Sequence, residues 1–316
     1  MRGTRPSALR PEAALAAALL AGFVVFPFIG GSSDMFGRIL IWGLFGLGFD
    51  LLFGYTGLLS FGQAAFYGTG GYVCAWLLTT HTIANVWLAL VIGTLAAGVW
   101  GMLVGWLALR RIGIYFAMIT LALAQMVYFF CVEAPFTHGE DGIQAVPQGK
   151  ALGLFDLSNP RILYVFVAVV FLFGFLAIQR IVNSPFGEIL KAIRENEPRV
   201  ISLGYRSTQY KLAAFILSAG LAGLAGATKA IVAQNASLTD VAFAMSGEVV
   251  LMTLVGGMGT FYGPVVGALI VVAMQNYLAQ FGEWVTVIQG VVFVACVLAF
   301  PRGIVGELAA RAKISL

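Results

Sequence analysis

Residues 162–182 read ILYVFVAVVFLFGFLAIQRIV, and Arg180 is the one charged side chain in this run. Inside a bilayer the backbone has to satisfy its own hydrogen bonds, and a helix does so within a single segment. About 20 apolar residues in a helix are enough to cross the hydrocarbon core. The stretch therefore predicts a transmembrane helix, and it indicates that the rest of the chain folds in a lipid bilayer.

The composition of the whole chain agrees with that segment. Of the 316 residues, 60 % are hydrophobic and 10 % are charged, whereas a soluble domain has about 25 % charged residues. Eighteen Lys and Arg and 14 Asp and Glu are too few to cover a soluble surface of this length. These numbers exclude a soluble globule, and we expect residues 1–316 to form a single membrane domain surrounded by the lipid bilayer.

Hydropathy predicts an all-α integral membrane protein with about ten transmembrane helices. The eighth, 247–261, is short, so it is either a full crossing or a re-entrant segment. The predicted spans are 13–29, 39–56, 60–80, 86–109, 112–132, 162–182, 211–233, 247–261, 263–281 and 284–301.

The distribution of charge predicts the orientation of these spans, because Lys and Arg are in excess on the cytoplasmic side of membrane proteins. With the N-terminus inside, ten crossings place Arg110, Arg111 and the loop 183–211 in the cytoplasm. The long external loop, 133–161, then holds more acidic than basic residues. We therefore expect both termini to be cytoplasmic.

Two blocks of four spans, the second to the fifth and the seventh to the tenth, begin on opposite sides of the membrane. They are candidates for an inverted repeat of the kind found in many transporters. Each block contains a glycine-rich segment, at 54–71 and at 256–267. Interrupted backbone is tolerated in a membrane only beside protein or a cavity, so these segments indicate a transport pathway. Plain helix packing is the alternative interpretation.

Few ionisable residues lie inside the predicted spans, and Asp50, Lys229 and Glu248 are the main ones. A charge near the bilayer centre costs about 2.5–3.5 kcal/mol on insertion scales. Asp50 and Glu248 lie near the ends of their spans, so each either lines a cavity or is solvated at the membrane interface. The candidate translocation path comprises Asp50, Ser60, Gln63, Glu248, Gly256, Gly257 and Gly259.

Two predicted helices carry small residues spaced four apart, which allows membrane helices to approach closely. These are Gly93, Ala97, Gly101 and Gly105 on one helix, and Ser218, Ala222 and Gly226 on the other. We expect a tight helical bundle.

The sequence contains no motif for catalysis or for a bound cofactor. The one Gly-Lys pair, Gly149-Lys150, lacks the phosphate-loop pattern, and neither a serine-hydrolase nor a zinc-protease motif occurs. The three cysteines lie far apart in apolar runs, and the two histidines have no partner at metal-ligand spacing. We therefore predict no enzyme activity, no metal site, no resident cofactor and no nucleic-acid partner.

The charged segment 183–211 has the pattern of folded helices. Ser184 is placed to cap a helix with Pro185 at its first position, and apolar residues then recur at helical spacing. Pro198 is expected to end this helix, and a second, short helix closes at Gly204. An amphipathic helix pair on the cytoplasmic side suits a groove on a partner protein. A helix lying on the lipid surface is the alternative.

Residues 184–226, SPFGEILKAIRENEPRVISLGYRSTQYKLAAFILSAGLAGLAG, resemble the cytoplasmic loop and following helix of ABC-type permeases for branched-chain amino acids, specifically of the LivM type. Three further stretches agree in order: FDLLFGYTGLLSFGQAAFYGTGGY at 49–72, THGEDGI at 137–143 and SGEVVLMTLVGGMGTFYGPVVGA at 246–268. The resemblance covers about residues 38–305.

This resemblance implies a subunit of an importer in the bacterial inner membrane. Such a permease pairs with a second, homologous permease of the LivH type, and two cytoplasmic ATPase subunits bind ATP and Mg. A periplasmic binding protein delivers the ligand. The region 188–204 then enters a cleft in an ATPase subunit, and its coupling residues are Glu188, Lys191, Arg194, Glu195, Glu197 and Gly204.

The sequence departs from the family pattern at two places. Pro198, Arg199 and Val200 stand where small residues are more typical. The external stretch 137–142 reads THGEDG where a Gly-Gly pair is common. The candidates for docking of the binding protein are His138, Glu140 and Asp141.

The resemblance thus predicts an importer of branched-chain or other hydrophobic amino acids that works by alternating access. Related permeases carry urea, amides or aromatic acids, which leaves the substrate open among these classes. A self-contained secondary transporter or channel is the alternative of a different class.

Overall fold

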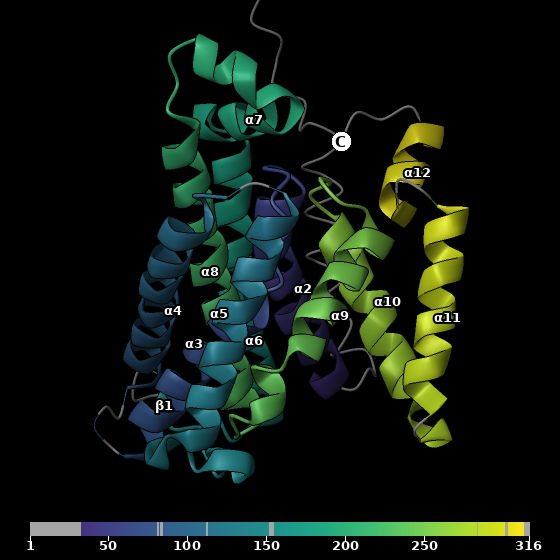
Figure 1. Cartoon of the computed structure of the whole chain (residues 1–316). Helices are drawn as coiled ribbons and strands as arrows, with labels where there is room; N and C mark the ends of the chain where they lie inside the picture. Colours follow the sequence, from purple (N-terminus) through teal and green to yellow (C-terminus); the bar gives the residue numbers. More distant parts are fainter. Residues whose placement is uncertain are drawn as a thin grey trace, which may run out of the picture.

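A computed structural model describes residues 33–80, 82, 85–111, 113–151, 155–282, 284–300 and 303–312 (Figure 1). Apart from one two-residue hairpin, β1 (Lys150–Ala151) with β2 (Phe155–Asp156), the described chain is helical. The α-helices are α2 (Ser33–Phe53), α3 (Gln63–Thr79), α4 (Val86–Ala108), α5 (Ile114–Glu133), α6 (Pro160–Val182), α7 (Pro185–Ser202), α8 (Ser207–Val232), α9 (Phe243–Gly256), α10 (Gly263–Leu278), α11 (Trp284–Ala299) and α12 (Gly303–Ala312). Short 3₁₀ turns are η1 (Pro135–Thr137), η2 (Gly139–Asp141), η3 (Leu238–Asp240) and η4 (Ala279–Phe281).

Six stretches of the described chain are long and apolar enough to cross a membrane, and α9 and α10 are shorter apolar helices. The expected span 13–29 lies outside the described residues, while each of the other nine overlaps a helix. The total of ten spans, the inverted repeat and the orientation of the termini remain predictions. With 14 residues, α9 is about 21 Å long, which is shorter than the hydrocarbon core of about 30 Å. Both interpretations of 247–261, a full crossing and a re-entrant segment, therefore remain predictions.

The centre of the bundle is α8, which packs against α3, α4 and α2. The expected small-residue stripes lie at these contacts. A Cβ at Gly101 of the first stripe would collide with Ala219 of α8, and one at Gly226 of the second stripe would collide with the backbone of Tyr67 in α3. Backbones therefore approach closely because side chains are absent, as the sequence predicts.

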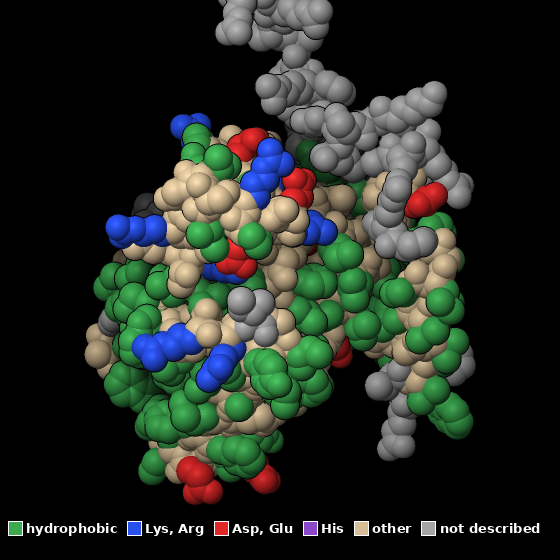
Figure 2. Space-filling model, turned by 45° about the horizontal axis from the view of Figure 1, so that its top comes forward, with side chains coloured by type: hydrophobic (Ala, Val, Ile, Leu, Met, Phe, Trp, Pro, Cys, Tyr) green, Lys and Arg blue, Asp and Glu red, His purple; other side chains and the backbone are tan. Residues whose placement is uncertain are grey.

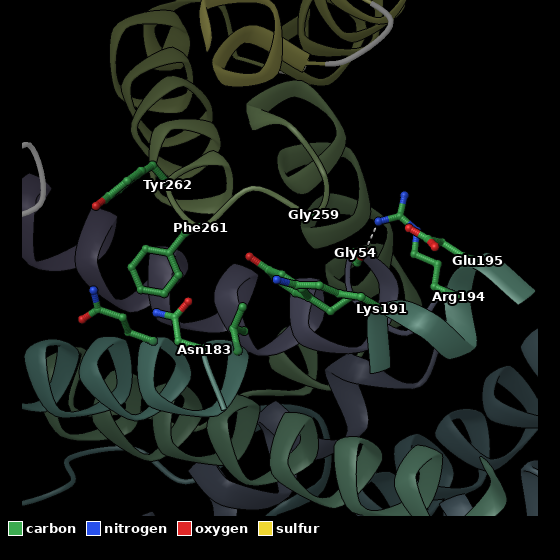
Figure 3. Close-up of a pocket in the computed structure, with 11 residues that line it drawn as sticks. Gly54, Asn183, Lys191, Arg194, Glu195, Gly259, Phe261 and Tyr262 are labelled. Carbon is green, nitrogen blue, oxygen red and sulfur yellow. Dashed lines mark hydrogen bonds between the residues drawn. The ribbon is translucent and has the colours of Figure 1, made fainter. Parts of the chain in front are cut away.

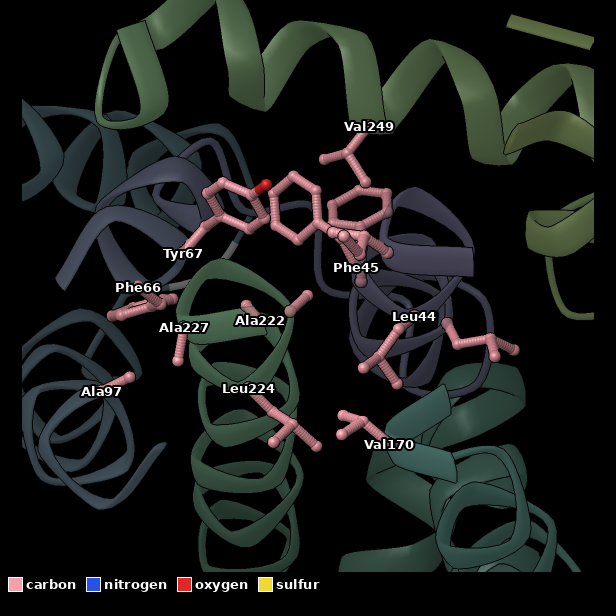
Figure 4. Packing of buried hydrophobic residues seen from close by; sticks show 14 of the residues in the cluster. Leu44, Phe45, Phe66, Tyr67, Ala97, Val170, Ala222, Leu224, Ala227 and Val249 are labelled. Atoms are coloured by element: carbon pink, nitrogen blue, oxygen red, sulfur yellow. The ribbon is translucent and has the colours of Figure 1, made fainter. Parts of the chain in front are cut away.

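Aromatic side chains fill the space between α2, α3 and α9. Phe45 of α2 lies 4.7 Å from Tyr67 of α3, measured between ring centroids, and Val249 of α9 lies beside them (Figure 4). Phe45, Tyr67 and Val249 are each at most 2 % exposed. This cluster joins α2, α3 and α9 in the middle of the molecule.

The outer flank of the bundle is apolar. Large side chains on α5 and α11 are exposed, among them Ile114 at 78 % and Leu298 at 78 %. Lys, Arg, Asp and Glu instead gather around α7 at one end of the molecule, and hydrophobic side chains cover the flank below it (Figure 2). This arrangement is that of a multi-pass membrane protein with a charged end.

Gly226 and Gly220 lie on the same helix and offer a matched test of the close packing. A Cβ at Gly226 would collide with the backbone carbonyl of Tyr67, whereas nothing lies within 4 Å of a Cβ at Gly220. Overpacking a membrane core costs about 1–3 kcal/mol, so Gly226→Ala should lower the melting temperature of the detergent-purified protein. Gly220→Ala should leave it unchanged or raise it. Equal melting temperatures for the two variants would contradict this packing.

Candidate functional site

The charged helix α7 is two helical pieces joined at Asn196, which has non-helical φ and ψ of −157° and 87°. The Asn196 Oδ1 accepts a hydrogen bond from the Arg199 N–H at 3.2 Å and so caps the second piece. The prediction that Pro198 ends the first helix is wrong. Pro198 instead lies in the first turn of the second piece, where its missing N–H has no intrahelical partner to lose.

The two ends of α7 differ in how well the sequence predicted them. Ser184 stands at the N-cap position, but its hydroxyl donates to the Ile181 carbonyl at 2.6 Å and makes no cap hydrogen bond. The predicted side-chain cap is therefore wrong. Gly204 has φ +91° and closes the helix, as predicted.

One face of α7 is buried against the bundle and the other is exposed. Gly187, Leu190 and Ile193 are buried, and a Cβ at Gly187 would collide with the backbone of Val182. The exposed face carries Glu188, Lys191 and Glu195. Three of the predicted coupling residues thus have exposed, charged side chains, and two of them, Lys191 and Glu195, also border a cavity.

Glu197 fixes α7 to the start of α8. Its carboxylate lies 2.6 Å from the Lys211 Nζ. Partial burial raises the pKa of Glu197, but hydrogen bonds from Lys211 and Ser207 outweigh that effect, and the net pKa lies below the usual value for a glutamate. The ionised form is therefore part of this contact.

Arg194 connects α7 to both glycine-broken segments. Its guanidinium donates a hydrogen bond to the Gly54 carbonyl, just after α2 (Figure 3). The same side chain lies against Gly57 and, through its Nη1, against Gly259 of the α9–α10 connection. Nearby, the Lys191 Nζ lies 5.8 Å from the centroid of the Tyr55 ring. The sequence placed Arg194 on the coupling helix but gave no sign of these partners.

Asp50 joins the two broken segments to each other. Its carboxylate is 1 % exposed and accepts a hydrogen bond from the Gly259 N–H at 2.8 Å. Gly54 touches both groups, because a Cβ there would collide with the Asp50 carboxylate and the Gly259 N–H. Gly257 and Gly259 have φ of +123° and +71°, which favours glycine. Asp50, Gly257 and Gly259 are thus brought together as a candidate site.

A cavity of about 530 Å³ opens beside this junction, which we call the α7 cavity (Figure 3). Sequence reasoning missed Gln179, Asn183, Phe261 and Tyr262 in its wall. The sequence feature that could have pointed to this cavity wall is Gln179, a polar residue within an apolar span. The cavity is lined by Gly54, Tyr55, Gln179, Val182, Asn183, Lys191, Arg194, Glu195, Gly259, Phe261 and Tyr262.

Ser60 and Gln63 lie apart from the cavity, in a buried polar group at the start of α3. Both are 0 % exposed. The Gln63 Nε2 donates to the Ser218 Oγ at 3.2 Å, and the Ser246 Oγ accepts the Ala64 N–H at 2.9 Å. The Gln63 Oε1 has no hydrogen-bond partner among the described residues. Ser60 and Gln63 are not among the residues that line the α7 cavity.

Glu248 also lies away from Asp50, in a cleft at the opposite end of the bundle that we call the distal cleft. Its volume is about 720 Å³. The 26 residues of α8 span about 39 Å between the α7 end and this cleft. The walls include Asp34, Arg38, Ile41, Trp42, Tyr67, Lys229, Val232, Asn235, Asp240, Met245 and Glu248.

His138, Glu140 and Asp141 are exposed on the long loop after α5. An isolated β-bridge between Ile143 and Ala236 ties this loop to the connection that follows α8. His138 has φ +60° and ψ +24°, a left-handed conformation that favours glycine. The loop lies at the end of the bundle opposite α7 (Figure 1).

A charged helix joined to two broken membrane helices, with a cavity at each end of the bundle, is an arrangement expected of a membrane transport protein. Residues 32–297 match the family model described as "Branched-chain amino acid transport system / permease component", and the chain belongs to this family. It is a transport protein and not an enzyme.

The chain is similar to curated permeases from three organisms. It is 29 % identical to the high-affinity branched-chain amino acid transport system permease protein LivM of Salmonella typhimurium and to that of Escherichia coli, in each case over 91 % of this chain and 73 % of the relative. It is 24 % identical to a probable LivM of Methanocaldococcus jannaschii, over 78 % of this chain and 82 % of the relative. No solved structure gives a significant match.

Lowering the pH should remove the stability that Glu197 contributes. Because its folded pKa lies below that of an unfolded glutamate, its contribution is complete above about pH 4.3 and is lost as the pH falls through the folded pKa. The melting temperature of Glu197→Gln should therefore lie below that of wild type at pH 7, and the two should converge once the pH falls below the lowered folded pKa of Glu197. Glu195→Gln, an exposed control on the same helix, should follow wild type throughout. A Glu197→Gln deficit that persists in acid would contradict this role.

Proposed function

We propose that this chain is the transmembrane permease subunit of an ABC importer in a bacterial inner membrane, and that it carries branched-chain amino acids. Its working assembly comprises a second, homologous permease, two cytoplasmic ATPase subunits that bind ATP and Mg, and a periplasmic binding protein. Membership of the permease family and the names of the LivM relatives support this substrate over urea, amides or aromatic acids.

The observation that carries the proposal is the contact of Arg194 with both broken segments. An ATPase subunit seated on the exposed face of α7 would displace Arg194, and Arg194 touches Gly54 and Gly259 directly. Motion of α7 therefore reaches the ends of α2 and α9 without an intermediate side chain. This is a route by which ATP binding would change the side to which the cavity opens.

The predicted residues then take three roles. Glu188, Lys191 and Glu195 face the ATPase subunit. Glu197 and Gly204 hold the shape of α7, the first through Lys211 and the second through its turn. The loop with His138, Glu140 and Asp141 lies at the opposite end of the bundle, where it would meet the binding protein.

Reconstitution into proteoliposomes tests the proposed function. Leucine uptake should require the second permease, the two ATPase subunits, the binding protein and ATP together, because this chain lacks a phosphate loop. Uptake by this chain alone without ATP would instead identify a self-contained transporter. Uptake of urea without leucine uptake would overturn the proposed substrate.

Replacing Arg194 tests the route of coupling. A hydrogen bond to a charged group contributes about 1.5–3 kcal/mol, equivalent to roughly tenfold or more in an equilibrium. Arg194→Ala should lower leucine uptake by about tenfold and leave ATP hydrolysis by the assembled transporter largely intact. Arg110→Ala is the matched control, because its guanidinium stacks on Trp106, 4.2 Å from the ring centroid, and it should transport normally. Full uptake by Arg194→Ala would contradict this route.

A further inference from the structure

Some charged side chains in the distal cleft are paired with a neighbouring residue, and others are not. Lys229 and Asp240 are satisfied, because they form an ion pair at 2.7 Å, and the Lys229 Nζ also donates to the Asn235 Oδ1 at 2.7 Å. Arg38 and Glu248, in contrast, have no such ion-pair partner among the described residues.

Arg38 and Glu248 therefore face the cleft with spare hydrogen-bonding capacity. The guanidinium of Arg38 has five N–H donors, and none of them is used by a described residue. From the described residues, the Glu248 carboxylate accepts one long hydrogen bond, from the Gln275 Nε2 at 3.4 Å. The α2 wall of the cleft thus offers the donors of Arg38 beside the carboxylate of Asp34, and the α9 wall offers acceptors on the carboxyl group of Glu248.

Apolar side chains form about half of the cleft lining. Ile41 and Trp42 of α2, Val232 of α8 and Met245 of α9 all line it. Small-molecule sites are typically about 300–1,000 Å³, mostly apolar, with a few placed polar groups, and the volume of about 720 Å³ lies within that range. The ligand that matches these walls carries an anionic group, a cationic group and an aliphatic side chain.

We propose that the distal cleft is a binding subsite for a zwitterionic α-amino acid with an aliphatic side chain. Its carboxylate pairs with the Arg38 guanidinium, since that fork matches carboxylate geometry. Its ammonium group pairs with the Glu248 carboxylate, and its side chain lies against Trp42 and Met245. The Lys229–Asp240 pair holds the wall formed by α8 and η3. This inference rests on the proposed function and adds to it a place where the permease itself contacts the ligand.

The test is direct binding of radiolabelled leucine to the assembled transporter in nanodiscs, without the binding protein. Leucine should bind and compete with itself. Isoamylamine lacks the carboxylate and 4-methylpentanoate lacks the ammonium group, so each should compete at least tenfold more weakly. Equal competition by either analogue, or no leucine binding at all, would overturn the proposal.

Variants identify the cleft as the place of binding. Arg38→Gln and Glu248→Gln should each weaken leucine binding at least tenfold, and Arg38→Lys, which keeps the charge, should recover part of the loss. Arg161→Gln and Glu133→Gln remove exposed charges outside the cleft and should bind as wild type does. Wild-type affinity in both cleft variants would overturn the subsite.

A separate measurement distinguishes this inference from the proposed function. Leucine uptake that depends on the ATPase subunits, together with unchanged binding by both cleft variants, would refute the subsite alone. Absence of any ATP-dependent leucine uptake by the wild-type assembly would refute the proposed function and, with it, the subsite.

Discussion

A carboxylate buried in a membrane protein has to find hydrogen-bond donors, because removing it from water is costly. Asp50 finds one in the backbone N–H of Gly259. That donor is free because α9 ends at Gly256 and the following backbone leaves the helix with positive φ. The break in α9 and the burial of Asp50 are therefore two parts of one interaction, and it holds the end of α2 against the α9–α10 connection.

The same helix, α2, reaches both cavities. Its first half lines the distal cleft through Arg38 and Trp42, and its end borders the α7 cavity at Gly54. Between them Phe45 and Phe49 are 0 % exposed, so the apolar middle of α2 separates the two spaces. Under the proposed function, a change in the side of access requires α2 to move relative to α9. The aromatic cluster and the Asp50 hydrogen bond are the contacts that such a motion rearranges.

Local features of the fold could be predicted from the sequence. Apolar runs predicted the membrane helices of the described chain, small residues four apart predicted the contacts of α8, and Gly204 predicted the end of α7. These features depend on residues near one another in the chain, or on a requirement for close backbone approach that small residues satisfy. The break at Asn196 was mislocated because a side-chain cap and a proline in the first turn give the same pattern as a proline that ends a helix.

Contacts between distant segments could not be predicted. Arg194 reads as one more exposed charge on an amphipathic helix, yet its partner, the Gly54 carbonyl, lies 140 residues away in the chain. Asp50 and Glu248 look alike in the sequence, since each is an acid near the end of a span. Only the fold shows that Asp50 lies at the junction beside α7 and Glu248 in the distal cleft.

Gly54 is the point at which these contacts meet. Its carbonyl accepts from Arg194, and its Cα lies so close to the Asp50 carboxylate and the Gly259 N–H that no Cβ fits. A side chain between them could change rotamer and absorb a small displacement. Gly54 has no side chain that could do so, and its backbone lies directly against the Asp50 carboxylate and the Gly259 N–H, so a displacement of Arg194 that keeps its hydrogen bond shifts the end of α2, the Asp50–Gly259 hydrogen bond, or both. The absence of a side chain at Gly54 is thus what makes the junction a stiff connection between α7 and the two broken helices.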